Sequence, residues 1–467
     1  MAYLKSCVFT FLIVFSSCFA LETLCFHNVF ENKCLCKKFT DTETNLPTSL
    51  ANCNGLAIDK FPDFSQFPQD LTALDLSMNN IQMLEVAGET SSATLRNLSL
   101  SYNVINDITE DFFKGFESLI SLDLSHNDLK SLSGSFDGNI FSTLDKLVYL
   151  DLSYNEIAKL PSAIFYPLPV LDSLSLSYNP LGEFLMQAKD TLTQVLGVST
   201  NLTQLRLNNV GLSDKLHPDF FTPYKNLTHL ELQDNDFEYI PSLPYSLEFL
   251  DFSGNKLSFV SARYLQYHSL KVLRISRMPS LNSIHHYAFY NLLALESLIL
   301  TDCPNVQEFS ELAFGLASKS METHLTSLVL ARNGITNLNS TYGHMFKNMR
   351  HIDLRHNTWA CGCKTLWLQE FEAEMFKSRD LRCSSPSNLK GKRIMELTHL
   401  DLQECFPDIY GKSSHKLTII ILMFAVIFLM GIIFYLIRYP KSWLGDKQIG
   451  ISPNSPYSAA PQDEDKF

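Results

Sequence analysis

The chain has 467 residues, a formal net charge of −12, 46% hydrophobic residues, 18% charged residues and eleven cysteines. Its low charge and abundant Phe and Leu exclude a mainly disordered chain. The acidic balance argues against a nucleic-acid-binding protein, which needs a basic surface to neutralise phosphates. Because eleven is an odd number, disulfide pairing cannot use every cysteine of the encoded chain.

The first residues have the form of a secretory signal peptide. A basic start at Lys5 and an apolar run precede small residues at Cys18 and Ala20. We therefore expect residues 1–20 to be removed, which takes Cys7 and Cys18 with them, and the rest of the chain to enter an oxidising compartment.

A repeated frame fills residues 71–358. Residues 147–157 have the form L-x-x-L-x-L-x-x-N-x-L, and the same frame recurs twelve times with a mean period of about 25 residues, which is typical of leucine-rich repeats. The frames begin at Leu71, Leu95, Leu119, Leu147, Leu171, Leu202, Leu227, Leu247, Leu270, Leu295, Leu325 and Met349. We expect each frame to supply one short strand, and the strands to stack into the parallel concave sheet of an α/β solenoid.

The ninth position of the frame is asparagine in nine of the twelve repeats. Its amide can satisfy backbone groups of the turn and of neighbouring coils. Val210, Met278 and Cys303 take this position in the other repeats, so we expect Cys303 to be a buried thiol; the alternative is a reactive or intermolecular cysteine. A buried stripe on the convex side is expected from five phenylalanines six residues before a frame: Phe113, Phe141, Phe165, Phe221 and Phe289.

Positions three, five, seven and eight are expected to point outward from a concave sheet about 50–60 Å long, at about 4.8 Å per strand. The early frames carry acidic and tyrosine side chains there, whereas the last four carry arginine and histidine. Tyr and Arg are typical anchors of protein interfaces. The candidate partner-binding residues are therefore Tyr102, Tyr154, Tyr178, Arg274, Arg277, Arg332 and Arg355.

Four N-glycosylation sequons occur, at Asn97, Asn201, Asn226 and Asn339. Asn97 occupies position three of its frame, so a glycan on it would rise from the concave face. We hypothesise that this glycan shields the second repeat and directs partners towards later repeats or an edge. A glycan-occupancy map that finds Asn97 unmodified would remove the hypothesis.

Two groups of four cysteines flank the repeats, in residues 21–70 and 359–405: Cys25, Cys34, Cys36 and Cys53, then Cys361, Cys363, Cys383 and Cys405. With Trp359 and Trp367 around the second group, they resemble the terminal caps of extracellular leucine-rich-repeat proteins, the family that includes Slit, Toll ectodomains and the Nogo receptor. The resemblance covers Cys25 to Cys405, and it departs from the family at Gly362, where Asp is common.

The resemblance implies a horseshoe closed at both ends by disulfides. The implied pairs are Cys25–Cys36, Cys34–Cys53, Cys361–Cys383 and Cys363–Cys405. Spacing alone allows three connectivities in each cap. Zinc is the other use of four cysteines, but a secreted context without a paired C-x-x-C favours disulfides, and we expect no metal or cofactor.

Residues 417–437 form an uncharged apolar run of 21 residues, which as a helix of about 31 Å matches a bilayer core. We expect this run to be a transmembrane helix, joined to the second cap by a stalk at residues 406–416. Residues 438–467 contain a Pro/Ser-rich, acidic run at 451–465, so they are expected to be a disordered cytoplasmic tail, too short for a Toll-type signalling domain.

These features predict a single-pass type I protein of the plasma membrane with an extracellular N-terminus. We expect an adhesion protein, receptor or co-receptor that binds an extracellular or cell-surface protein through its ectodomain. Nucleophile-elbow, metalloprotease and phosphate-loop motifs are missing, so no catalysis is expected. One alternative is an auxiliary subunit that modulates a channel or receptor in the same membrane through the helix at 417–437; another is a shed ectodomain that acts as a soluble scavenger.

Overall fold

The computed structural model describes residues 23–24, 34–40, 47–86, 91–132, 139–188, 190–316, 324–371 and 381–438. The chain divides into two compact units, Met1–Leu397 and Thr398–Phe467. The expected signal peptide, Cys25 and the expected tail beyond Arg438 lie outside the described residues.

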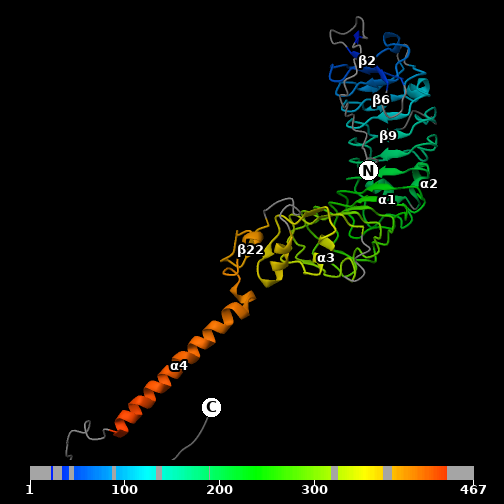
Figure 1. Ribbon diagram of the computed structural model, residues 1–467. Coiled ribbons are helices and arrows are strands. Elements are labelled where there is room, and N and C mark those ends of the chain that lie inside the picture. The colour runs from blue at the N-terminus through cyan, green and yellow to red at the C-terminus, as the bar shows by residue number, and fades with distance from the viewer. Residues whose placement is uncertain are drawn as a thin grey trace, which may run out of the picture. The chain divides into compact units, whose positions relative to one another are not determined.

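One long sheet organises the first unit, and each frame contributes one strand to it, as predicted (Figure 1). These strands are β4 (Ala73–Asp75), β6 (Asn97–Ser99), β8 (Ser121–Asp123), β9 (Tyr149–Asp151), β10 (Ser173–Ser175), β11 (Gln204–Arg206), β12 (His229–Glu231), β13 (Phe249–Asp251), β15 (Val272–Arg274), β17 (Ser297–Ile299), β19 (Ser327–Val329) and β20 (His351–Asp353). All pair in parallel, and every strand covers positions three to five of its frame. Position four is therefore in register throughout, with Leu122 opposite Leu150, for example.

The core follows from the leucine spacing. Leu147, Leu150 and Leu152, at positions one, four and six of their frame, are all fully buried, and the other frames repeat this pattern. Burying one such side chain contributes about 1.5–3 kcal/mol. The predicted phenylalanine stripe is confirmed, because its five members are buried, and the rings of Phe113 and Phe165 each lie 6.1 Å from that of Phe141.

The predicted asparagine ladder is also confirmed. The Asn127 amide nitrogen donates to the carbonyls of Leu100 and Leu124, each at 3.0 Å, and its oxygen accepts from the Ile105 N–H at 3.0 Å. One buried side chain thus satisfies backbone groups of its own coil and of the preceding one. Cys303, which replaces asparagine, is a free and fully buried thiol, and its N–H donates to the Asn333 side chain at 2.9 Å.

Short elements occur on the return segments of several coils. They are β5 (Met83–Leu84), β7 (Asp107–Ile108), η2 (Phe112–Gly115), α1 (Gly182–Gln187), α2 (Leu192–Leu196), β14 (Phe259–Val260), β16 (Ser283–Ile284), β18 (Glu308–Phe309) and α3 (Tyr342–Phe346). The long spacer between the frames at Leu171 and Leu202 holds α1 and α2. Thr191 begins α2 by accepting from the Gln194 N–H, and Gly197 ends it with a left-handed φ of 71°.

The N-terminal cap extends the sheet by three strands, β1 (Thr23–Leu24), β2 (Leu35–Thr40) and β3 (Pro47–Asn52), followed by η1 (Phe64–Gln66). The strand β3 pairs in parallel with β4 but antiparallel with β2, so the strand direction reverses between β3 and β2 in the cap. A disulfide joins Cys34 to Cys53, and Cys36 is disulfide-bonded as well. The implied pair Cys25–Cys36 stays a prediction.

The C-terminal cap covers the last coil with β21 (Trp359–Ala360), η4 (Cys363–Glu370), β22 (Cys383–Ser385) and η5 (Ile394–Glu396). The Trp367 indole N–H donates to the Leu338 carbonyl at 3.1 Å, and its ring lies 5.4 Å from that of Phe346. A disulfide joins Cys361 to Cys383. Cys363 and Cys405 are both disulfide-bonded, and their mutual pairing stays a prediction.

The second unit contains η6 (Gln403–Cys405) and the long helix α4 (Pro407–Arg438). Within α4, Thr418–Arg438 has a mean hydropathy of 3.0 over its most apolar window, and no part of that window is covered by the rest of the protein. By length and composition this helix could cross a membrane, and the expected span at 417–437 falls within α4.

Candidate partner-binding face

A left-handed backbone conformation recurs at position eight of all twelve frames, just after each strand. The φ angles at Tyr102, Tyr154 and Tyr178 are 54°, 53° and 56°, and Gly254 is the glycine of the set. This conformation costs an ordinary L-residue roughly 1–2 kcal/mol. Its repetition sets one side chain per coil on a continuous row: Met78, Tyr102, His126, Tyr154, Tyr178, Asn209, Asp234, Gly254, Arg277, Asp302, Arg332 and His356.

Four consecutive members of that row, Tyr102, His126, Tyr154 and Tyr178, stack face to face, and we call them the aromatic ladder. Their ring centroids are 4.0, 4.0 and 4.1 Å apart, with planes inclined by 10°, 10° and 9°. The ladder contains all three tyrosines proposed from the sequence, together with His126, which was not proposed. Tyr102 and Tyr154 remain 50% and 42% exposed, so the rims of the rings face solvent although their inner faces are covered.

The stack changes the acid–base behaviour of its members. Burial, followed by the hydrogen bond with Tyr178, raises the pKa of Tyr154 to about 12. Burial lowers the pKa of His126 below its ordinary value, and the charge of Asp151 opposes this effect. Tyr154 and His126 are therefore neutral at pH 7.

Asp75, Asp123 and Asp151, at position five of their frames, form an acidic row beside the aromatic ladder. The Asp123 carboxylate accepts from the Ser125 N–H at 2.9 Å, and that of Asp151 accepts from the Ser153 N–H at 2.8 Å. The serine at position seven thus orients the carboxylate at position five. Burial and the neighbouring Asp151 charge raise the pKa of Asp123.

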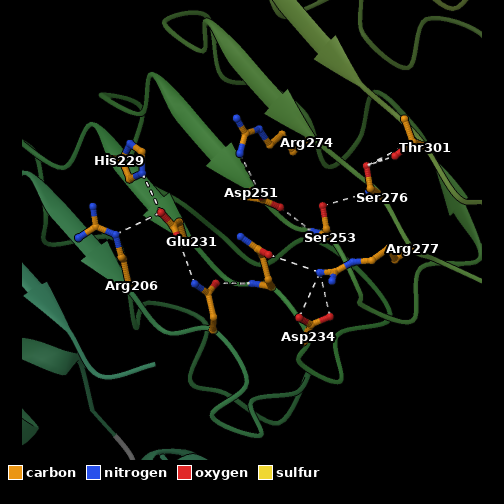
Figure 2. A network of polar contacts seen from close by, with 12 residues as sticks. Arg206, His229, Glu231, Asp234, Asp251, Ser253, Arg274, Ser276, Arg277 and Thr301 are labelled. Atoms are coloured by element: carbon orange, nitrogen blue, oxygen red, sulfur yellow. Dashed lines mark hydrogen bonds and ion pairs between the residues drawn. The ribbon is translucent and has the colours of Figure 1, made fainter. Parts of the chain in front are cut away.

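A polar network follows the acidic row along the sheet, and Figure 2 shows Arg206 and His229 directed at Glu231 within it. The Glu231 carboxylate accepts from Arg206 Nε at 3.2 Å and from Asn208 Nδ2 at 2.7 Å, and its Oε1 lies 3.1 Å from His229 Nε2. Burial acts to raise the pKa of Glu231, but the hydrogen bonds from His229 and Asn208 and the Arg206 charge lower it to about 2. The Phe249 ring stacks on His229 at 4.0 Å.

Each arginine proposed from the sequence has an acidic partner on the face. Arg274 Nη1 lies 3.7 Å from Asp251, and Arg277 Nη2 lies 3.0 Å from Asp234 (Figure 2). Arg332 contacts Asp302 at 2.5 Å, and Arg355 contacts Asp353 at 2.6 Å. The arginines do lie on the concave face, but their charges are balanced locally.

The sequon asparagines differ in their surroundings. Asn201, Asn226 and Asn339 are exposed, whereas Asn97 is half-buried within β6, between Ala73 and Ser121 of the adjacent strands. Within the described ranges, no group of three or more His, Cys, Asp or Glu residues could hold a metal ion.

Family models and known proteins agree with this architecture. A leucine rich repeat model matches residues 69–129, 93–140 and 130–181, and a second matches 322–338. Tsukushi of Gallus gallus is 26% identical over 73% of this chain and 81% of its own length. Lumican of Coturnix japonica is 28% identical, over 57% of this chain and 77% of its length.

Toll-like receptor 2 of Macaca mulatta is 24% identical, and the match covers 59% of this chain and 34% of the receptor. The chain thus spans most of the length of Tsukushi and lumican but about a third of this receptor. Together with the observed strands, ladders and caps, this similarity makes the chain a member of the leucine-rich-repeat family, similar to members that are extracellular or at the cell surface.

Proposed function

We propose that this protein is a single-pass cell-surface protein that binds a protein partner through the concave face of its ectodomain and has no catalytic activity of its own. The observation that carries the proposal is the row of side chains at position eight. Twelve coils keep a left-handed conformation there, and in four of them bulky aromatic residues accept it to form an ordered, solvent-facing ladder. Because the conformation is common to every turn of the repeat, the partly exposed rings that it presents, and not the conformation itself, support a binding role.

The chemistry of the face supports protein recognition. Tyrosine and arginine anchor many interfaces because they combine apolar area with hydrogen-bonding groups at little entropic cost. Here the stacked rings and the ion-paired arginines are pre-ordered, so a partner would lose less free energy on binding than with mobile side chains.

The proposed cell-surface location depends on α4 and on the sequence before residue 21. A secretory signal followed by one apolar helix would place the repeats outside the cell and residues 438–467 inside, as a type I protein. The Thr418–Arg438 stretch supports the membrane span by its length and hydropathy.

The test is a binding screen of the secreted ectodomain, residues 21–416, against cell-surface and secreted proteins. Each partner found is then measured against Tyr154→Ala, at the centre of the ladder, and against Tyr166→Ala, a surface tyrosine that is 79% exposed and outside the frame positions of the face. We expect the first variant to lose at least tenfold in affinity and the second to bind as wild type. Equal binding by both would refute the concave face as the site.

A second candidate function is an auxiliary subunit of a channel or receptor in the same membrane. The observation that favours it is the uncovered apolar surface of Thr418–Arg438, which could pack against other membrane helices. Replacement of this stretch with an unrelated apolar helix discriminates the two: unchanged activity favours the ectodomain function, and lost activity favours the auxiliary one.

A further inference from the structure

The charges on the concave face are arranged differently in its two parts. In the seven frames from Leu202 onwards, each outward-pointing carboxylate has an arginine partner, as in the Glu231–Arg206 and Asp302–Arg332 pairs. In the five frames from Leu71 to Leu171, the outward positions contain no Lys or Arg at all. The acidic row of these frames is held by serine and tyrosine donors, and within the described residues no ion pair neutralises it.

The acidic row is closely spaced. Asp123 and Asp151 lie directly opposite each other on the paired strands β8 and β9, and Asp75 lies two strands further along, beyond Ser99. With about 4.8 Å between strands, the three carboxylates span roughly 14 Å. Two adjacent like charges on a half-buried surface repel each other, and the pKa of Asp123 is raised first by its burial and then by the charge of Asp151.

The aromatic ladder beside the row limits what can bind. Because the rings stack on one another at 4.0–4.1 Å, their inner faces are not open to a sugar ring or to a base. Their rims, extended by the 57% exposed Met78, instead offer an apolar edge along the carboxylates. A long cationic side chain fits such a surface, since its aliphatic stem can lie on the ring edges while its charged group reaches a carboxylate.

We propose that the concave face of the first five frames binds a cationic segment of a protein partner, which places at least two Lys or Arg side chains on the row formed by Asp75, Asp123 and Asp151. The inference rests on the proposed function and names the chemistry of the partner. Anionic ligands such as sulfated glycans and nucleic acids are repelled by this part of the face. The proposed binding surface ends at Arg206, whose charge is paired with that of Glu231.

The experiment uses the full-length chain displayed on cells and a fluorescent peptide of four Gly-Arg-Ser units, with four Gly-Gln-Ser units as the uncharged probe. The test variant is Asp123→Asn with Asp151→Asn, which keeps the side-chain volumes and removes two charges. The matched control is Asp302→Asn with Arg332→Gln, which removes an ion pair of the same face without changing its net charge. Each is also measured with Asn97→Gln, because that sequon lies on the same face.

We expect the arginine peptide to bind wild type and control at least tenfold more tightly than the test variant, in at least one of the two Asn97 backgrounds. The glutamine peptide should bind none of them measurably. Equal binding to test variant and wild type in both backgrounds, or equal binding of the two peptides, would overturn the inference. A protein partner from the screen that loses affinity on Tyr154→Ala but not on the double Asp variant would also overturn it, while leaving the proposed function intact.

Discussion

The Glu231 carboxylate offers a quantitative test of the polar network. Its pKa falls from an ordinary 4.5 to about 2 in the folded protein, a difference equivalent to about 3 kcal/mol of folding free energy at pH 7. Removal of the charge as Glu231→Gln leaves Arg206, whose side chain is only 14% exposed, without its counter-charge. Loss of one partner of a buried ion pair costs about 3–5 kcal/mol, in agreement with this figure. We therefore expect a loss of about 3 kcal/mol.

The assay is denaturant unfolding of the secreted ectodomain, followed by circular dichroism, at pH 7 and at pH 3. The control is Asp234→Asn, which breaks the exposed pair with Arg277 and should cost less than about 1 kcal/mol. The folded-state pKa of Glu231 is depressed, so its contribution is complete above about pH 4.5 and is lost as the pH falls towards 2. More than half of the difference between wild type and Glu231→Gln should therefore disappear at pH 3.

Two outcomes would contradict this reasoning. If Glu231→Gln destabilises the ectodomain no more than Asp234→Asn does, the network is not held by the Glu231 charge. If the difference from wild type is the same at pH 7 and pH 3, the substitution acts through packing or hydrogen bonding and not through the lowered pKa.

Three further predictions concern single residues. Asn127→Ala should lower the free energy of unfolding by about 1–3 kcal/mol, because it leaves the buried Ile105 N–H without its acceptor. The Leu100 and Leu124 carbonyls still accept from the amides of Asn103 and Asn155; a transition temperature equal to that of wild type in thermal unfolding would contradict this prediction. Burial raises the pKa of Cys303 to about 11, so iodoacetamide should modify it only in denaturant, and mass spectrometry of native protein should find it unlabelled. Glycopeptide mapping should find Asn201 occupied and the half-buried Asn97 occupied less often; full occupancy at Asn97 would instead support a glycan shield on the second repeat.

The repeat frame predicted the architecture because its information is local and repeated. The spacing of Leu147, Leu150 and Leu152 defines which side of a strand is buried, and Asn155 at position nine follows from the same spacing. Cys303 could be predicted as a buried thiol for this reason: it occupies a position whose environment the other frames had already defined.

The ion pairs of the concave face were harder to predict from the sequence, because each depends on residues in two neighbouring frames. Arg274 and Asp251 both occupy position five of neighbouring repeats, so the sequence held the information that they would meet. Along the chain, however, the arginines and histidines of the last four frames only contrast with the acidic early frames, whereas across the sheet each arginine is balanced by a carboxylate. Tyr102 and Tyr154 do not themselves signal a left-handed conformation; the signal lies in the other frames, where Asn209, Asp234, Gly254 and Asp302, residue types that accept this conformation, occupy position eight.

The direction of the strand pairing has a mechanical consequence. The short strands run perpendicular to the axis along which the coils stack. A force that pulls the Cys34–Cys53 cap and the Cys361–Cys383 cap apart therefore acts along the hydrogen bonds between strands and breaks them one strand pair at a time. Each coil contacts mainly its neighbours, so tension would release coils in succession at modest force. If the protein is anchored in a membrane and a partner bound to the early repeats pulls on it, the repeats would extend. This extension would take place before the partner dissociates.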